Sequence, residues 1–199
     1  MNLKHPVFAY SQVAEVAEKF LVNYYPSLLL PIPIEVIAER DLGINIIPVC
    51  NMKQNYDIDA CLDSSLRRIF IDMDKYMKYE NRSRFSIAHE IGHLVLHRGI
   101  FTKLNIRTEE DILNLTANTN EEEYSWLQHQ ANWFAGLVLV PRKKLIEAIQ
   151  NRSKKTVVSM SFEELLPIFP DLENEFQVSG EVLIRRLEKE GICKPESSF

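Results

Sequence analysis

Hydrophobic residues recur on one helical face in two N-terminal segments. Within residues 11–24 the apolar positions follow a helical period, and Pro26 ends the run. Pro33 suits the first turn of a second, shorter helix over residues 34–40, which Gly43 terminates. We therefore expect the chain to begin with an amphipathic helix and a short helix.

Short β-branched runs follow these two helices. Residues 44–49 and 68–72 are rich in isoleucine, and residues 57–63 form a further extended stretch between them. We interpret the three segments as the strands of a small sheet.

The helical period of apolar positions also predicts helices in the centre of the chain. Residues 83–97 place their apolar side chains on one face of a helix, and Arg98 with Gly99 is expected to stop it. A long helix is predicted for residues 121–139, and Pro141 closes it.

Two more predicted helices complete the chain, one near residues 162–168 and one over residues 180–190. Paired helices of this kind are typical of helix-turn-helix DNA-binding units, but the last one mixes acidic and basic side chains and has no basic stripe. The whole pattern predicts an α+β fold with a small three-stranded sheet. We expect a single domain over residues 1–199, with a catalytic core at 10–141 and a helical, helix-turn-helix-like part at 142–199.

Composition narrows the class of protein. A length of 199 residues with 46% hydrophobic residues is sufficient for one compact domain. No apolar run approaches the roughly 18 residues that span a bilayer, and no signal peptide is evident. Three widely spaced cysteines, Cys50, Cys61 and Cys193, fit reduced thiols better than disulfides. We therefore expect a cytoplasmic protein with no membrane attachment.

The charge balance bears on nucleic-acid binding. The formal net charge is -5 and the pI is about 5.6. Attraction to phosphate requires a basic surface, so direct binding to nucleic acid is not expected.

One of the predicted helices contains the sequence His89-Glu90-Ile91-Gly92-His93. Positions four apart share a helical face, so the two imidazoles can bind one metal ion, and Glu90 can reach a water on that ion. Zinc suits such a site because it takes nitrogen and oxygen ligands tetrahedrally and can leave one position for water. The implied chemistry is amide hydrolysis, with Zn²⁺ as cofactor and Glu90 as general base.

Gly92 lies in the middle of this motif. Glycine inside a helix costs about 1 kcal/mol relative to alanine. We therefore expect another segment of the chain, or a substrate, to approach the helix closely at Gly92.

Two longer segments are specific in combination: RFSIAHEIGHLVLH at residues 84–97 and QANWFAGLVLVP at residues 130–141. Together they resemble the ImmA/IrrE-type metallopeptidases, and the resemblance extends over about residues 10–195. It implies a zincin-like metallopeptidase domain. Known members are bacterial, are often encoded on mobile elements or in stress operons, and cleave a partner helix-turn-helix repressor.

The resemblance also implies roles for individual residues. His89 and His93 would be metal ligands, and Glu90 would be the catalytic base. In the family the third ligand is a glutamate three residues before the alanine-asparagine pair, and this chain has Gln128 at that position. A glutamine can coordinate through its amide oxygen, but it brings no charge and would hold zinc more weakly.

Two other residues of the same predicted helix are alternatives to Gln128 as the third ligand. Glu121 lies seven residues earlier on nearly the same face, although about 10 Å away along the axis. His129 is rotated about 100° from that face.

Two residues close to Gln128 on the same predicted helix each have two possible roles, one in the metal site and one that is only structural. Asn132, one turn after Gln128, is expected either to orient a metal ligand or to be a surface amide. Tyr124, one turn before, is expected either to hydrogen bond to an oxyanion or to be a half-buried aromatic. His97 is expected to turn away from His93 and to act as a partner of the helix dipole.

Two functions remain open. The first is a zinc-dependent endopeptidase that cleaves a partner protein, with residues 59–62 as an edge strand to which an extended substrate adds. The second is a catalytically weak or inactive relative that binds a regulator without cleaving it. Gln128 is the residue that separates the two.

Overall fold

The computed structural model describes residues 7–108, 111, 121–153 and 160–192. Its three strands form one sheet, as predicted, with the order β1-β3-β2. The strands are β1 (Asn45–Val49), β2 (Ala60–Leu62) and β3 (Arg68–Asp72). β3 pairs parallel to β1 and antiparallel to β2, so β2 is an edge strand.

Helices make up most of the described chain, so the fold is mixed α+β and mainly helical. In the N-terminal half these are α1 (Tyr10–Tyr24), α2 (Ile34–Val36) with the π-helical turn η1 (Ile37–Asp41), α3 (Met52–Tyr56), α4 (Met73–Lys78), α5 (Glu80–Leu96) and α6 (Arg98–Phe101). In the C-terminal half they are α8 (Glu121–Leu139), α9 (Arg142–Ser153), α10 (Phe162–Leu165), the 3-10 turn η3 (Leu166–Ile168), α11 (Phe169–Phe176) and α12 (Gly180–Lys189).

The strongly periodic helices follow their predicted bounds closely. α8 spans residues 121–139, as expected, and α1 begins one residue before its predicted start. The prediction that Arg98 and Gly99 stop the central helix is only half right. α5 ends at Leu96, but the chain turns at His97 and continues as α6, because no residue here prevents a new helical turn.

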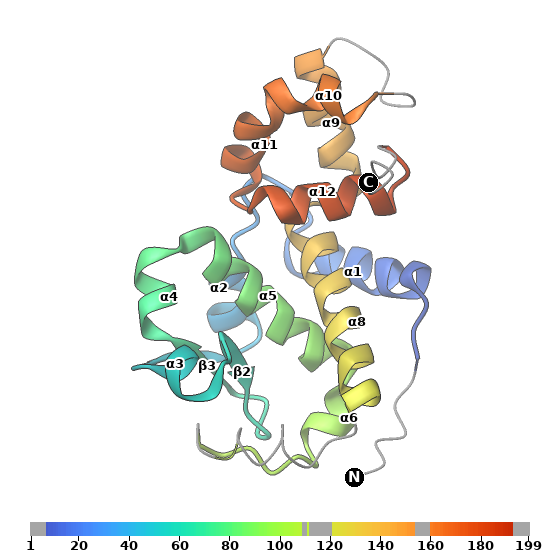
Figure 1. The fold of residues 1–199 in the computed structure, drawn as a ribbon. Helices are drawn as coiled ribbons and strands as arrows, with labels where there is room; N and C mark the ends of the chain where they lie inside the picture. The colour runs from blue at the N-terminus through green and yellow to red at the C-terminus, as the bar shows by residue number, and fades with distance from the viewer. Residues whose placement is uncertain (1–6, 109–110, 112–120, 154–159, 193–199) are drawn as a thin grey trace.

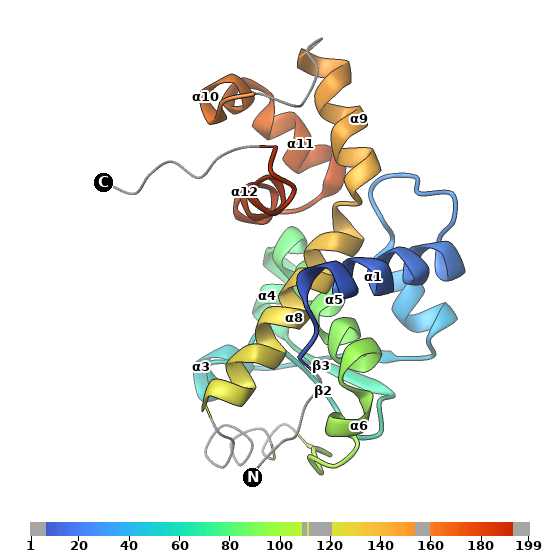
Figure 2. The same cartoon turned by 90° about the vertical axis from the view of Figure 1, so that its right-hand side faces the viewer.

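In both views of the molecule, α9–α12 gather at one end and the sheet lies toward the other (Figures 1 and 2). α5 and α8 run through the middle, and α1 packs across α8. The rings of Phe20 on α1 and Phe134 on α8 meet edge to face at 5.4 Å. One cluster of buried apolar residues includes members of every long helix, from α1 to α12.

A buried arginine joins the start of α5 to two distant segments. Arg84 donates hydrogen bonds to the carbonyl of Ile32, at 2.7 Å, and to that of Gln177, at 3.3 Å. It also pairs with Glu35 at 3.2 Å. These bonds satisfy a guanidinium that would be costly to bury alone, and they tie α5 to the segments at Ile32 and Gln177.

α5 approaches α8 closely at Gly92. A Cβ atom there would lie 3.1 Å from the Cα atom of Ala131 and 3.2 Å from its carbonyl oxygen. Both contacts are with backbone, which cannot move aside as a flexible side chain can. The expectation that another segment approaches Gly92 is confirmed: the segment is α8.

Among the described residues, no helix combines the length and the apolar character that crossing a membrane requires.

We predict that Gly92→Ala lowers the free energy of unfolding by about 1–2 kcal/mol, because overpacking against α8 outweighs the gain in helix propensity. Chemical denaturation monitored by circular dichroism measures this. Gly99→Ala is the matched control, because a Cβ at Gly99 meets no atom within 4 Å. Equal effects of the two substitutions would show that the helix contact at Gly92 is not tight.

Candidate metal centre

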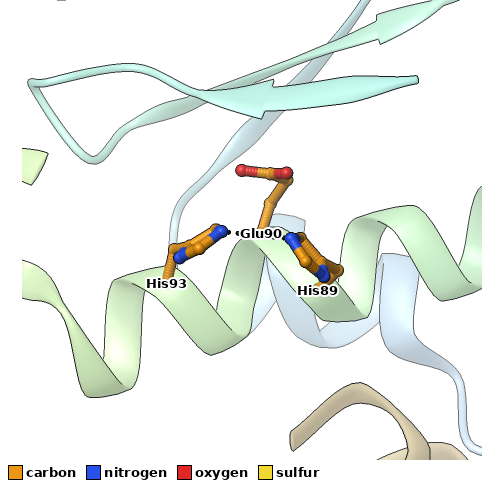
Figure 3. A group of neighbouring side chains, drawn as sticks. All are labelled: His89, Glu90 and His93. Atoms are coloured by element: carbon orange, nitrogen blue, oxygen red, sulfur yellow. Dashed lines mark hydrogen bonds between the residues drawn. The ribbon is translucent and has the colours of Figure 1, made fainter. Parts of the chain in front are cut away.

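The candidate centre lies where α5 faces α8. Among the described residues, His89, Glu90 and His93 form a group whose possible ligand atoms all lie within 4.8 Å of one another. The two imidazoles point toward each other, while the carboxylate of Glu90 points past them toward the sheet (Figure 3). α8 contributes Gln128 and Asn132 from the opposite side.

The donor atoms converge on one position. The Nε2 atoms of His89 and His93 are 3.0 Å apart. Gln128 places its Oε1 atom 2.9 Å from Nε2 of His89 and its amide nitrogen 3.3 Å from Nε2 of His93. Ligands held tetrahedrally by zinc at about 2.0–2.1 Å lie roughly 3.3 Å from one another. The residues present therefore fit a metal ion that takes nitrogen and oxygen ligands.

Burial keeps both imidazoles in the form that binds metal. Desolvation lowers the pKa of His89, and it lowers the pKa of His93 further. Only the unprotonated nitrogen of an imidazole can donate its lone pair to an ion. Both side chains are therefore ready to act as ligands near neutral pH.

Asn132 orients the first histidine. Its Oδ1 atom lies 2.9 Å from Nδ1 of His89. With an ion bound at Nε2, Nδ1 would carry the proton of the ring and donate it to that oxygen, which fixes the orientation of the imidazole. Of the two roles considered for Asn132, the structure places it in the hydrogen bond to His89.

The expectation that the side chain of His97 turns away from His93 is wrong. Its Nδ1 atom lies 3.0 Å from Nδ1 of His93, and its side chain is buried. The physical reason is that positions four apart share a helical face, and the N–H of His97 still donates to the carbonyl of His93 at 2.9 Å. The four-residue spacing from His93 was the signal in the sequence for this contact.

The structure gives different information on the two alternatives to Gln128 as the third ligand. His129 does not join the cluster: its ring packs against Trp126, with centroids 6.1 Å apart. Glu121 begins α8, but its side chain lies outside the described residues. Of the residues whose side chains are described, Gln128 is the one that α8 brings to the Nε2 atoms of both histidines.

Glu90 is held by the sheet. The backbone N–H of Leu62, in edge strand β2, donates to Oε2 of Glu90 at 2.7 Å. Burial raises the pKa of Glu90 to about 8, although this hydrogen bond acts in the opposite direction. At neutral pH the carboxyl group is therefore mostly protonated in the metal-free protein, and a bound cation would favour the carboxylate that a general base requires.

A family comparison complements this geometry. The model of the Peptidase_M78 family, described as the IrrE N-terminal-like domain, matches residues 39–188. The chain belongs to this family. The resemblance to ImmA/IrrE-type metallopeptidases is thereby confirmed.

Solved structures add a likeness of fold. The chain is similar to a Mycobacterium tuberculosis transcriptional regulator, with a TM-score of 0.56 and 16% sequence identity. The match covers 88% of this chain and 46% of that one, so the IrrE-like chain spans less than half of the regulator's length. A search of curated proteins gives no match.

A cleft of about 600 Å³ opens beside the histidines of this IrrE-like domain. Tyr124 and Cys61 line it together with the centre. Burial raises the pKa of the Tyr124 hydroxyl, so it stays protonated and can donate a hydrogen bond into the cleft. Burial also raises the pKa of the Cys61 thiol, which agrees with a packing role rather than a reactive one.

We predict that Gln128→Glu tightens zinc binding on the order of tenfold or more, because a charged ligand replaces a neutral one. Gln128→Ala should weaken binding, and His129→Ala should leave it unchanged. Competition with a chromophoric chelator measures all three. If both Gln128 variants bind zinc as the unsubstituted chain does, Gln128 is not a ligand.

Proposed function

We propose that this chain is a zinc-dependent endopeptidase in which His89, His93 and Gln128 hold the metal and Glu90 is the general base. The observation that carries the proposal is the convergence of two imidazole nitrogens and one amide oxygen beside a buried carboxyl group. Membership of a family of metallopeptidases supports it. A bound zinc ion would supply an acidified water and polarise a carbonyl group.

The residues of the chain then perform the proton transfers. Leu62 holds Oε2 of Glu90 at 2.7 Å, so the carboxyl group cannot swing away from the histidines. Oε1 accepts the proton of the attacking water, and Glu90 then delivers it to the departing amine. Tyr124 lies across the cleft and donates to the oxygen on which negative charge develops.

The edge of the sheet offers a place for an extended peptide. Asp72 N donates to Asp59 O at 2.9 Å and Asp63 N donates to Arg68 O at 3.0 Å, so these two residues of the β2 segment face β3. The alternate residue Ala60 directs its backbone groups to the outer edge, where a peptide can pair with them.

The space around the centre is suited to a polypeptide. A groove of about 1150 Å³ runs between α5, α8 and α12 and shares four residues with the cleft. Together the two exceed the roughly 300–1,000 Å³ typical of small-molecule sites. The shared residues are Asp59, Phe85, Ser86 and Asn132.

We further propose that the substrate is a helix-turn-helix repressor in a bacterial cytoplasm, encoded with this chain on a mobile element or in a stress operon. The family resemblance supports this choice, and the regulator of similar fold links the architecture to transcriptional control. Residues 1–199 would act as one domain, which the continuous apolar cluster supports.

The neutral amide of Gln128 favours a second candidate function. With no charged third ligand, a weakly metallated relative would bind the regulator without cutting it. The same cleft and edge strand would then serve as a docking surface.

We predict that Glu90→Gln lowers the cleavage rate by about 10²–10⁴-fold, because the general base is lost, while zinc affinity changes little. Incubation with purified helix-turn-helix repressors, followed by mass spectrometry, measures cleavage. Glu18→Gln, at an exposed position on α1, is the matched control. Stoichiometric zinc without cleavage, or cleavage that survives Glu90→Gln, would refute the peptidase mechanism.

A further inference from the structure

A row of buried polar groups leads from His93 to the N-terminal segment. His97 Nδ1 lies 3.0 Å from Nδ1 of His93, and His97 Nε2 lies 3.3 Å from Oε1 of Gln130. The same oxygen accepts a hydrogen bond from the backbone N–H of Phe8 at 3.3 Å. His97 and Gln130 are 1% and 0% exposed, so water does not replace these contacts.

The direction of each hydrogen bond follows from Phe8. A backbone N–H can only donate, so the atom of Gln130 that meets it is the amide oxygen, which can only accept. The partner nitrogen of His97, Nε2, must therefore carry the proton of that ring. In its neutral form the His97 ring has one N–H, so its Nδ1 is then an acceptor and Nδ1 of His93 donates to it.

This order leaves Nε2 of His93 without a proton. It is the nitrogen that faces His89, 3.0 Å away, and the amide of Gln128. With the opposite tautomer, a proton would occupy the position where the ligands converge and would have to move before an ion could bind.

We propose that His97 and Gln130 are positioning residues that hold His93 as its Nδ1–H tautomer, with the Nε2 lone pair directed at the metal position in the metal-free protein. The inference rests on the proposed function in taking His93 as a ligand. The backbone of Phe8 is the fixed end of the row because it sets the orientation of the Gln130 amide. The N-terminal segment thereby takes part in organising a centre built by α5 and α8.

The tautomers can be observed directly. The chain has five histidines, so long-range proton–nitrogen NMR spectra of metal-free protein labelled on histidine can be assigned by single substitutions. Under mildly alkaline conditions we expect His93 to be protonated at Nδ1 and His97 at Nε2. The reverse pattern, or a mixture of tautomers at His93, would overturn the proposal.

Substitutions test whether the row causes this preference. His97→Phe keeps a ring but removes the acceptor, and Gln130→Met removes the amide at similar volume. Each should produce mixed tautomers at His93 and weaken zinc binding by about 10–100-fold. His97→Gln, whose amide oxygen can accept from His93, should restore most of the affinity, and His129→Phe should change neither quantity.

The outcomes separate this inference from the proposed function. A merely structural role for His97 and Gln130 would lower stability in denaturation experiments but leave the tautomer of His93 unchanged, which would refute the inference. The spectra of the unsubstituted chain do not depend on any variant folding. If the tautomers are as expected and no protein is cleaved, the peptidase proposal fails while this inference stands.

Discussion

The close packing of α5 against α8 is the constraint on which the candidate centre depends. Gly92 has no side chain, so the backbone of Ala131 can come close to α5 at a position where a Cβ atom would be too near to it. That approach places Gln128, about one turn before Ala131, and Asn132, directly after it, against the two nitrogens of His89. The glycine that weakens the isolated helix thus allows the candidate ligands of α5 and α8 to come within reach of one ion.

The same packing determines the electrostatics of the centre. Because water is excluded, the imidazoles are neutral and Glu90 has a pKa of about 8, so the metal-free cluster carries little charge. Gln128 keeps it so. A glutamate there would bind a cation more strongly, but without metal it would add a second carboxyl group to a site that already resists ionisation. As a ligand, the glutamine would hold the metal more weakly than a glutamate but would lower the electrostatic cost of the metal-free state.

The sequence was a good guide where one physical signal dominates a segment. The apolar period of α8 predicted its bounds, and two β-branched runs predicted β1 and β3, with a third strand expected between them. Short helices without a long apolar period, such as α4 and α11, were not predicted, because neighbouring segments rather than their own pattern stabilise them. The motif likewise named the residues of α5 but gave no information on the strand that holds Glu90, since that contact joins residues distant in sequence.

His97 shows that the helical spacing still applies at the end of a helix. Its N–H donates to the carbonyl of His93 as in a continuing helix, so its ring lies on the same face, with the two Nδ1 atoms 3.0 Å apart. On α8, Gln130 lies two positions after Gln128 and so on a different face, where it meets His97 and the N-terminal segment. Two faces of α8 therefore serve one metal position: one carries the candidate ligand Gln128, and the other fixes the protons that would leave His93 free to bind.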